Sequence, residues 1–525
     1  MSPGRVQAGT VALEKLVRLS PLLALGAVAA LWAAVALVAA RGAGAGPHLG
    51  PDPASHSVLV VMPLTPRSDD GAHGWFGAGV ADAVVTRLRR VPGLTVASLA
   101  SVLDLESARP SPIEAARSLG AAAVLCGDYA LEEGRPVIAA RLLDAATGAV
   151  LWRRTVAGPP GGGAAPEDGL ADELARLVAP SVPPGPPAGK PLAPLAHYLA
   201  VLARGKIATA RSDAVADAVS LLERAIEADP SMAAAHALMS LASVDMFLGG
   251  LSSKGGWIGR SLASARRAVR LDPGLPDAHY ALGRALMVAG EPVEAAEATL
   301  RALELEPGHA RALAQLASFL AGAGLSEQGA VATARARLSD PLIEVGWQEA
   351  VLAEIEGRMD GEIRRWRLDV QARQASGDSP EVPLMLLAYL SQRAGNVADA
   401  LSFAASLDAV SRNTAYVDMI RLMSLGRQGR ADAVASIVER HREIYEKDWQ
   451  YAQWIGASFA EVGRRAEALE WLDRSVRLGS FDAWTFDHMP ELAPLRGEPR
   501  FDTAAGIVRS RAEAVMDLVD RSGWL

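Results

Sequence analysis

The chain has 525 residues and a formal net charge of −8, with 50% hydrophobic and 21% charged residues. This composition excludes a wholly disordered chain, and about 150 residues per domain predicts three or four units. The negative charge gives no indication of nucleic-acid binding over the whole molecule. The single cysteine, Cys126, excludes an intramolecular disulfide and any metal site built from several cysteines.

The first forty residues contain a segment without charges, Leu19 to Ala40. At 1.5 Å per residue it matches a hydrocarbon core about 30 Å thick, so we expect a transmembrane helix over residues 19–40. Lysine and arginine residues precede it, and after Arg41 no Lys or Arg follows before Arg67. This asymmetry predicts a cytoplasmic tail over 1–18 and an extracytoplasmic remainder. A cleaved secretory signal, with small residues at 43–45, is the rival interpretation; its apolar region would usually be only about 7–15 residues long.

A linker over 41–56 is expected to lead into an α/β unit over 57–157. Short β-branched runs at 57–64 and 94–97 predict strands, and apolar residues at helical spacing predict a helix over 76–90. A second helix is expected over 112–119, followed by strands over 122–130, 136–143 and 149–156. The order βαβαβββ predicts a sheet with helices on one side.

Several linked motifs in this unit resemble the TolB amino-terminal-like (FlgO-like) domain. They are Val60-Val61-Met62-Pro63-Leu64, Phe76-x-x-Gly79-Val80-x-x-Ala83, Arg89-x-Val91-Pro92-Gly93-Leu94-Thr95-Val96, Ala115-x-x-x-Leu119-Gly120, Val124-Leu125-x-Gly127 and Leu142-Leu143-Asp144-x-x-Thr147-Gly148-x-x-Leu151-Trp152. In many bacteria that domain lies outside the membrane and precedes tetratricopeptide repeats. The resemblance implies a fold and an extracytoplasmic location at the bacterial inner membrane, and it implies no catalytic residue.

Two features of this unit invite a chemical interpretation that we do not adopt. Gly74, Gly77 and Gly79 could form a phosphate-binding turn, but Asp82 stands where a third small residue is needed. About twelve residues also separate them from the preceding strand. Cys126 lies in an apolar run, which predicts a small buried hydrophobe and not a reactive thiol.

Residues 158–194 are rich in glycine and proline and predict a semi-rigid linker with a short helix over 170–178. After it, Pro273, Pro307 and Pro341 are spaced by 34 residues, and each ends an alanine-rich helical segment. The repeat that begins at Pro276 has Leu282-Gly283, Leu286, Gly290, Ala295, Ala302 and Pro307 at its recurring places.

These offsets resemble the tetratricopeptide repeat, a 34-residue helix–turn–helix unit. Small residues at places 8, 20 and 27 let neighbouring helices approach, and proline at place 32 ends the second helix. Weaker copies predict about eight stacked repeats over 195–480, with an insertion around Gly249 to Gly259 and inter-helix turns at Gly357, Gly395, Gly429 and Gly463. We expect a capping segment and a last helix, Thr503 to Val519, over 481–525.

The first helix of each repeat in such an array lines a concave groove. The groove-facing places predict a partner-binding set of Asp277, Tyr280, Arg284, Arg311 and Ser318. Met287, Gln450, Gln453 and Glu461 occupy equivalent places. His236 and His279 fall at the fourth place of a repeat, where we expect packing residues and not metal ligands.

The sequence therefore predicts an α/β domain followed by an all-α tetratricopeptide solenoid, with an N-terminal transmembrane helix. We expect a scaffold that binds protein or peptide partners, without catalysis, cofactor, metal or nucleic acid. The alternative is a signalling protein that acts on a separate cytoplasmic effector. Proteins that join this α/β domain to such repeats often carry a DNA-binding domain, a nucleotide cyclase or a kinase before the membrane helix.

Overall fold

The structure is a computed structural model, and it describes residues 58–67, scattered residues between 77 and 102, and residues 111–132, 135–157, 194–208, 212–249, 256–340, 343, 345–376, 379–411 and 413–524. The chain divides into two compact units, Met1–Pro191 and Leu192–Leu525. The expected membrane helix over 19–40, its flanking segments over 1–18 and 41–56, and the linker up to residue 193 lie outside the described residues. Among the described helices, none has both the length and the apolar character needed to span a bilayer.

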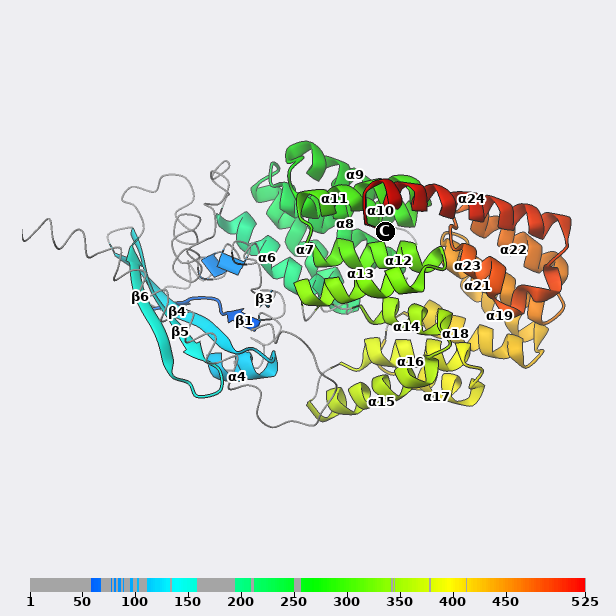
Figure 1. Ribbon diagram of the computed structural model, residues 1–525, viewed down its shortest axis with the longest axis horizontal. Helices are drawn as coiled ribbons and strands as arrows, with labels where there is room; N and C mark the ends of the chain where they lie inside the picture. Colours follow the sequence, from blue (N-terminus) through cyan, green and yellow to red (C-terminus); the bar gives the residue numbers. More distant parts are fainter. Residues whose placement is uncertain are drawn as a thin grey trace, which may run out of the picture. The chain divides into compact units, whose positions relative to one another are not determined.

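The first unit contains a six-stranded mixed sheet (Figure 1). Its path runs in the order β3-β1-β4-β5-β6, and β2 pairs with β4 outside this path. The strands are β1 (Val58–Val61), β2 (Thr65–Pro66), β3 (Thr95–Val96), β4 (Ala123–Glu132), β5 (Arg135–Asp144) and β6 (Val150–Ala157). The strand β1 lies between two parallel neighbours, which explains its continuous apolar run: Leu59, Val60 and Val61 are all buried.

Local sequence signals fix the ends of the elements around this sheet. The helix α4 (Pro112–Ser118) begins with a capping box, in which Ser111 and Glu114 satisfy each other's backbone N–H groups. At its other end Arg117 donates to the carbonyl groups of Ala145 and Ala146, which ties the helix to the turn between β5 and β6. The strand β2 was not expected, because two residues ending in proline give no periodic signal.

Gly77 and Cys126, for which the sequence analysis did not adopt a chemical role, both have structural explanations. Gly77 is helical, and a Cβ built on it would lie 1.9 Å from the carbonyl oxygen of Leu64, so this glycine permits close approach of backbone to backbone. Gly74 and Gly79 lie outside the described residues. The Cys126 thiol is 3% exposed, and burial raises its pKa, as expected for a packing residue.

The second unit consists of paired antiparallel helices. Within the part of this unit that the structure describes there are eight helical hairpins: α6 (Pro194–Ala208) with α7 (Ser212–Ala228), α8 (Ala233–Leu248) with α9 (Trp257–Leu271), α10 (Pro276–Ala289) with α11 (Pro292–Leu305), α12 (Ala310–Gly322) with α13 (Ser326–Ser339), α14 (Gly346–Ile355) with α15 (Met359–Ser376), α16 (Glu381–Arg393) with α17 (Val397–Asp408), α18 (Thr414–Arg427) with α19 (Ala431–Arg440), and α21 (Trp449–Glu461) with α22 (Arg465–Arg477). A single-turn helix, α20 (Arg442–Tyr445), precedes α21.

Small residues set the spacing within and between hairpins. A Cβ on Gly283 would lie 2.7 Å from Thr299 Oγ1, and one on Gly456 would lie 2.7 Å from Leu472 Cγ. Both glycines therefore allow the first helix of a hairpin to touch the second. The four glycines expected at inter-helix turns have φ values of 69°, 82°, 71° and 78°; they are Gly357, Gly395, Gly429 and Gly463.

The chain ends in a capping region of α23 (Ala483–His488), a 3₁₀ helix (Pro490–Leu495) and α24 (Pro499–Arg521). The helix α24 runs back across the array and contacts α22 and α11 (Figure 1). It extends beyond the expected span of 503–519 at both ends, and it begins earlier because Pro499 occupies the first helical turn, where proline is tolerated. The expected insertion around 249–259 is also shorter, since Trp257 already belongs to α9.

Candidate functional site

The two ends of the solenoid meet, and the helices between them surround a cavity. The turn between α10 and α11 touches the turn after α22: a Cβ on Gly479 would lie 2.1 Å from the carbonyl oxygen of Gly290. Asn413 Nδ2 donates to the carbonyl oxygen of Leu248, 165 residues earlier, at 3.2 Å. The helix α23 also contacts α12. The later hairpins therefore return to the earlier ones instead of extending away from them.

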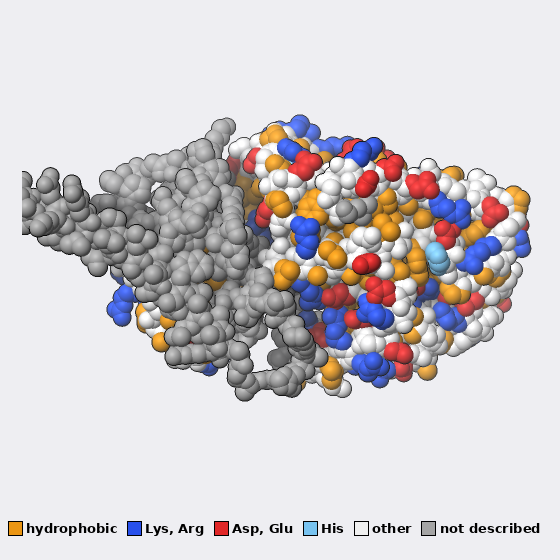
Figure 2. Space-filling view, viewed as in Figure 1, with side chains coloured by type: hydrophobic (Ala, Val, Ile, Leu, Met, Phe, Trp, Pro, Cys, Tyr) orange, Lys and Arg blue, Asp and Glu red, His pale blue; other side chains and the backbone are white. Residues whose placement is uncertain are grey.

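The cavity inside this closed turn has a volume of about 520 Å³. It is lined mainly by the first helices of seven successive hairpins, namely α8, α10, α12, α14, α16, α18 and α21, together with α23. A space of this size falls in the range of ligand-binding pockets, which is about 300–1,000 Å³. The face of the helical unit shown in Figure 2 has basic and acidic side chains next to one another.

Aromatic rings form a large part of the cavity wall. The ring centroids of Trp347 and Tyr389 are 4.8 Å apart, and those of Trp347 and Trp454 are 6.2 Å apart. On another part of the wall, Trp449 packs against Phe481 at 5.5 Å. Such rings provide contact area at low conformational cost, and their faces attract cations.

Carboxylates form the other conspicuous part of the wall. Asp245 pairs with Arg284 at 2.9 Å, yet burial raises the pKa of Asp245. Asp448 and Asp482 precede α21 and α23 and accept backbone N–H groups of the first helical turn. Burial raises the pKa of both carboxyl groups in spite of these bonds.

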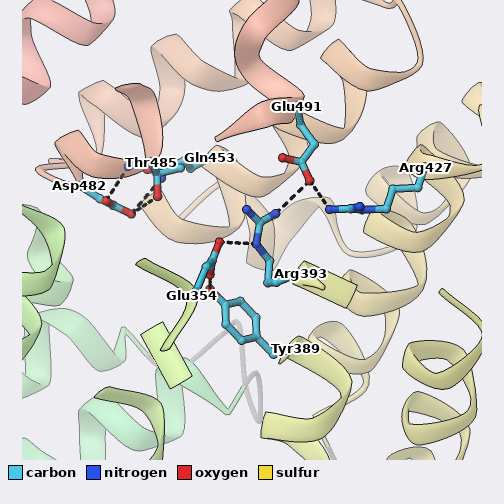
Figure 3. A network of polar contacts seen from close by, with 8 residues as sticks. All are labelled: Glu354, Tyr389, Arg393, Arg427, Gln453, Asp482, Thr485 and Glu491. Carbon is cyan, nitrogen blue, oxygen red and sulfur yellow. Dashed lines mark hydrogen bonds and ion pairs between the residues drawn. The ribbon is translucent and has the colours of Figure 1, made fainter. Parts of the chain in front are cut away.

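Figure 3 shows a network of charged and polar side chains, of which Glu354 and Tyr389 line the cavity. Glu354, which lines the cavity, accepts from Arg393 Nε at 2.6 Å and from the hydroxyl of Tyr389 at 2.5 Å. The same arginine donates to Glu491 at 3.0 Å, and Arg427 donates to Glu491 at 2.7 Å. Burial would lower the pKa of Arg393, but the two glutamates outweigh it and raise this pKa. The network links three hairpins to the capping 3₁₀ helix and fixes Glu354 and Tyr389 in place.

The structure separates the five predicted partner-binding residues into two groups. Arg284 and Ser318 line the cavity, where Ser318 accepts from Gln348 at 3.1 Å. Asp277, Tyr280 and Arg311 do not line it. Their assignment to partner binding stays a prediction.

Contacts within the array occupy two of these three side chains. Asp277 accepts from His309 at 2.9 Å and lies 3.6 Å from Arg204. Tyr280 is only 7% exposed and packs against the His309 ring, with centroids 5.4 Å apart.

The structure also shows where the other groove-facing residues and the two histidines of the sequence analysis lie. Met287, Gln450 and Gln453 line the cavity, whereas Glu461 does not. His236 and His279 are half-buried, and each donates from Nε2 to the carbonyl group of a proline six residues earlier. Each of these bonds holds the turn that precedes the helix of its histidine. Among the residues that the structure describes, no group of three or more His, Cys, Asp or Glu side chains is arranged to hold a metal ion.

The sequence prediction missed the aromatic and acidic parts of the wall. Trp347 and Tyr389 lie in first helices of the degenerate repeats, where the 34-residue register could not be followed. Phe481 and Asp482 lie after the last repeat and reach the cavity only because the solenoid closes. Tryptophan content gave no signal, because the second helices carry three, at 257, 366 and 471, just as the first helices do at 347, 449 and 454.

The comparisons with known proteins identify the repeat and give one curated relative. The family pattern "Tetratricopeptide repeat" matches residues 276–309. "Putative adenylate cyclase 3" of Rhizobium meliloti (strain 1021) is 28% identical over 249 residues, which cover 45% of this chain and 40% of that protein. The chain thus matches about two fifths of that relative's length.

Two solved structures are similar to the chain over part of its length. A human IFIT1 dimer with PPP-AAAA has a TM-score of 0.36 at 17% identity, covering 54% of this chain and 72% of its own. A structure of Naa15/Naa10 bound to HypK-THB has a TM-score of 0.20 at 16% identity, covering 62% and 53%. The fold described above and the matched repeat together make this chain a small sheet unit followed by a tetratricopeptide-type helical solenoid.

Proposed function

We propose that the chain is a membrane-anchored scaffold that binds a protein or peptide partner in the central cavity of its repeat array, on the extracytoplasmic side. The observation that carries this proposal is the 520 Å³ cavity lined by the first helices of seven successive hairpins. In this proposal the chain acts by binding and not by catalysis, and it needs no cofactor. In this proposal the sheet unit is a TolB amino-terminal-like domain that adds a second contact surface, and the motifs quoted in the sequence analysis support this assignment.

The binding part of the proposal is tested by crosslinking and pull-down from the membrane fraction with the full chain. The variant Trp454→Ala removes a half-buried ring from the cavity wall. We expect it to weaken capture of the partner by about 2 kcal/mol or more, since truncated aromatic hot spots cost that much. Tyr280 is unsuitable for this test because its burial makes any loss of binding indistinguishable from unfolding.

A control variant and an isolated segment show which part of the chain binds the partner. The control Glu297→Gln, on an exposed position of α11, should capture the partner as the parent does. Equal capture by a folded Trp454→Ala variant would contradict the assignment of the cavity. Capture by the segment 57–156 alone would make the sheet unit the partner-binding part.

The membrane anchor is tested by topology reporters. The charge-free span over 19–40 and its basic flank motivate a single crossing with the C-terminus outside the cytoplasm. Alkaline phosphatase fused to the C-terminus should be active, and a reporter that works only in the cytoplasm should be silent. The opposite pattern would reject the proposed location.

A signalling role is the second candidate, and the relative named as an adenylate cyclase favours it. In this version the array senses a partner and passes the signal to an effector in or below the membrane. Translation of the DNA upstream of Met1 checks for an in-frame effector domain. Deletion of the gene should then change the cellular level of cyclic AMP, whereas a plain scaffold leaves it unchanged.

A further inference from the structure

The charges on the cavity wall are unbalanced. Among the described residues, five carboxylates line the cavity against one guanidinium: Asp245, Glu354, Glu381, Asp448 and Asp482 against Arg284. Asp245 pairs with Arg284, Glu354 pairs with Arg393, and Glu381 accepts from the Ser411 hydroxyl at 2.7 Å. Asp448 and Asp482 have only uncharged donors.

Asp448 has one oxygen that no described group satisfies. Its Oδ1 accepts the backbone N–H groups of Gln450 at 2.7 Å and Tyr451 at 3.1 Å, which is the ordinary work of a helix N-cap. Its Oδ2 accepts from no donor in the part of the chain that the structure describes, although the side chain is only 7% exposed and lines the cavity. Capping alone does not compensate its burial, because its pKa stays raised with both N–H donors in place.

Asp482 lies on the same wall. Its Oδ2 accepts from the Thr485 hydroxyl at 2.6 Å and from Gln453 at 3.2 Å, so a side chain of α21 connects it to the helix that Asp448 caps (Figure 3). The rings that follow Asp448 and precede Asp482, Trp449 and Phe481, pack against each other at 5.5 Å. We call these residues, Asp448, Trp449, Gln453, Phe481 and Asp482, the acidic wall.

An arginine side chain would supply the positively charged donor that Asp448 and Asp482 do not have within the chain's described residues. Its planar guanidinium donates to carboxylates, stacks on aromatic rings and is more weakly hydrated than an ammonium group, so it loses less on entering a cavity. The cavity is also larger than one guanidinium requires, and Val351, Met385 and Leu386 offer apolar contacts to flanking residues. A peptide segment therefore fits the space better than a free cation.

We propose that the cavity binds an extended peptide segment of the partner whose arginine side chain enters it, with the guanidinium donating to Asp448 Oδ2 and lying against the acidic wall. This inference rests on the proposed scaffold function and names the chemistry of its partner. The negatively charged lining would also exclude segments that present a carboxylate at the same place.

The test uses the full chain in detergent and a positional-scanning library of acetylated, amidated hexapeptides. We expect arginine to be enriched at one position. In the best peptide, replacement of that arginine by citrulline, which keeps the shape and removes the charge, should weaken binding at least tenfold by calorimetry. Enrichment of acidic residues, equal binding of the citrulline peptide, or no enrichment at all would overturn the inference.

Matched variants locate the arginine. Asp448→Asn keeps an N-cap side chain, since asparagine caps as well as aspartate. It should weaken binding of the arginine peptide at least tenfold, while the variant melts no earlier than the parent because a poorly compensated buried charge is removed. Glu297→Gln, exposed on α11, should bind as the parent does. Asp482→Asn provides a second test on the same wall if the first variant melts early. Equal binding to both folded aspartate variants would overturn the assignment.

Two further experiments distinguish binding of an arginine-containing peptide from binding of a small cation and from the scaffold function alone. If N-acetylarginine amide binds as tightly as the best peptide, the occupant is a small cation and the peptide proposal fails. If Trp454→Ala abolishes capture of the natural partner while Asp448→Asn leaves it intact, the scaffold function stands and the arginine inference fails. Loss of capture in both variants, with citrulline rejected, supports the two together.

Discussion

Alanine packing between repeats is the residue-scale feature on which the array depends. Ala302 is 0% exposed at place 27 of its repeat, on a helix that contacts both α12 and α24. Ala302→Glu buries an unpaired carboxylate, so we expect a loss of about 3 kcal/mol or more in the free energy of unfolding. Urea titration measures it, with exposed Glu297→Gln expected within about 0.5 kcal/mol of the parent. Equal midpoints for both variants would show that the repeat register is wrong.

The carboxyl group of Glu461 makes the stability of the fold depend on pH. Burial, with the nearby Glu491 adding to it, raises the pKa of Glu461 from 4.5 to about 7. The folded state therefore holds a proton that the unfolded state loses between pH 4.5 and 7, and stability falls as the pH rises through this window. A full shift corresponds to about 3 kcal/mol, and partial exposure reduces this to about 1 kcal/mol.

Glu461→Gln removes that titration. We expect the variant to be more stable than the parent by about 1 kcal/mol at pH 8 and equal to it at pH 4.5. Urea titrations at the two pH values measure the difference. A variant that is less stable at pH 8 would indicate that Arg427 and Arg393 already compensate the charge.

At the scale of elements, the contact between two distant turns closes the solenoid. Gly479 has φ of 92°, and an added Cβ would lie 2.1 Å from the Gly290 carbonyl oxygen. Gly463 has φ of 78°, but nothing lies within 4 Å of its Cβ position. Gly463→Ala should therefore cost about 1 kcal/mol for the backbone conformation alone, and Gly479→Ala about 3 kcal/mol because the turns must also separate. Chemical denaturation of both variants measures the difference, and equal costs would exclude the closing contact.

The elements themselves were largely predictable from the sequence, whereas their closure was not. Proline at 34-residue spacing and glycine at the turns predict hairpins from local chemistry alone. The strands β5 and β6 differ from expectation by one residue at each end. The contacts Gly290–Gly479 and Leu248–Asn413 join residues far apart in the chain, and no periodicity encodes them.

Closure changes how the whole helical unit should unfold. In a linear solenoid each repeat contacts only its neighbours, so damage stays local. Here α24 connects α22 to α11, and the turn before α11 touches the turn after α22. The first and last parts of the closed turn therefore support each other directly.

Leu472→Ala tests this coupling. The side chain is 0% exposed in α22 and packs near Gly456, so its truncation should cost about 2–5 kcal/mol. Hydrogen exchange followed by mass spectrometry should then show faster exchange in α10 and α11 as well as in α21 and α22, because loss of the last hairpin releases the turn at Gly290. Leu368→Ala, at a position 67% exposed on α15, should change neither region. Faster exchange confined to α21, α22 and their sequence neighbours would mean that the array behaves as an open solenoid, and the cavity would then lack the rigidity that the proposed binding site requires.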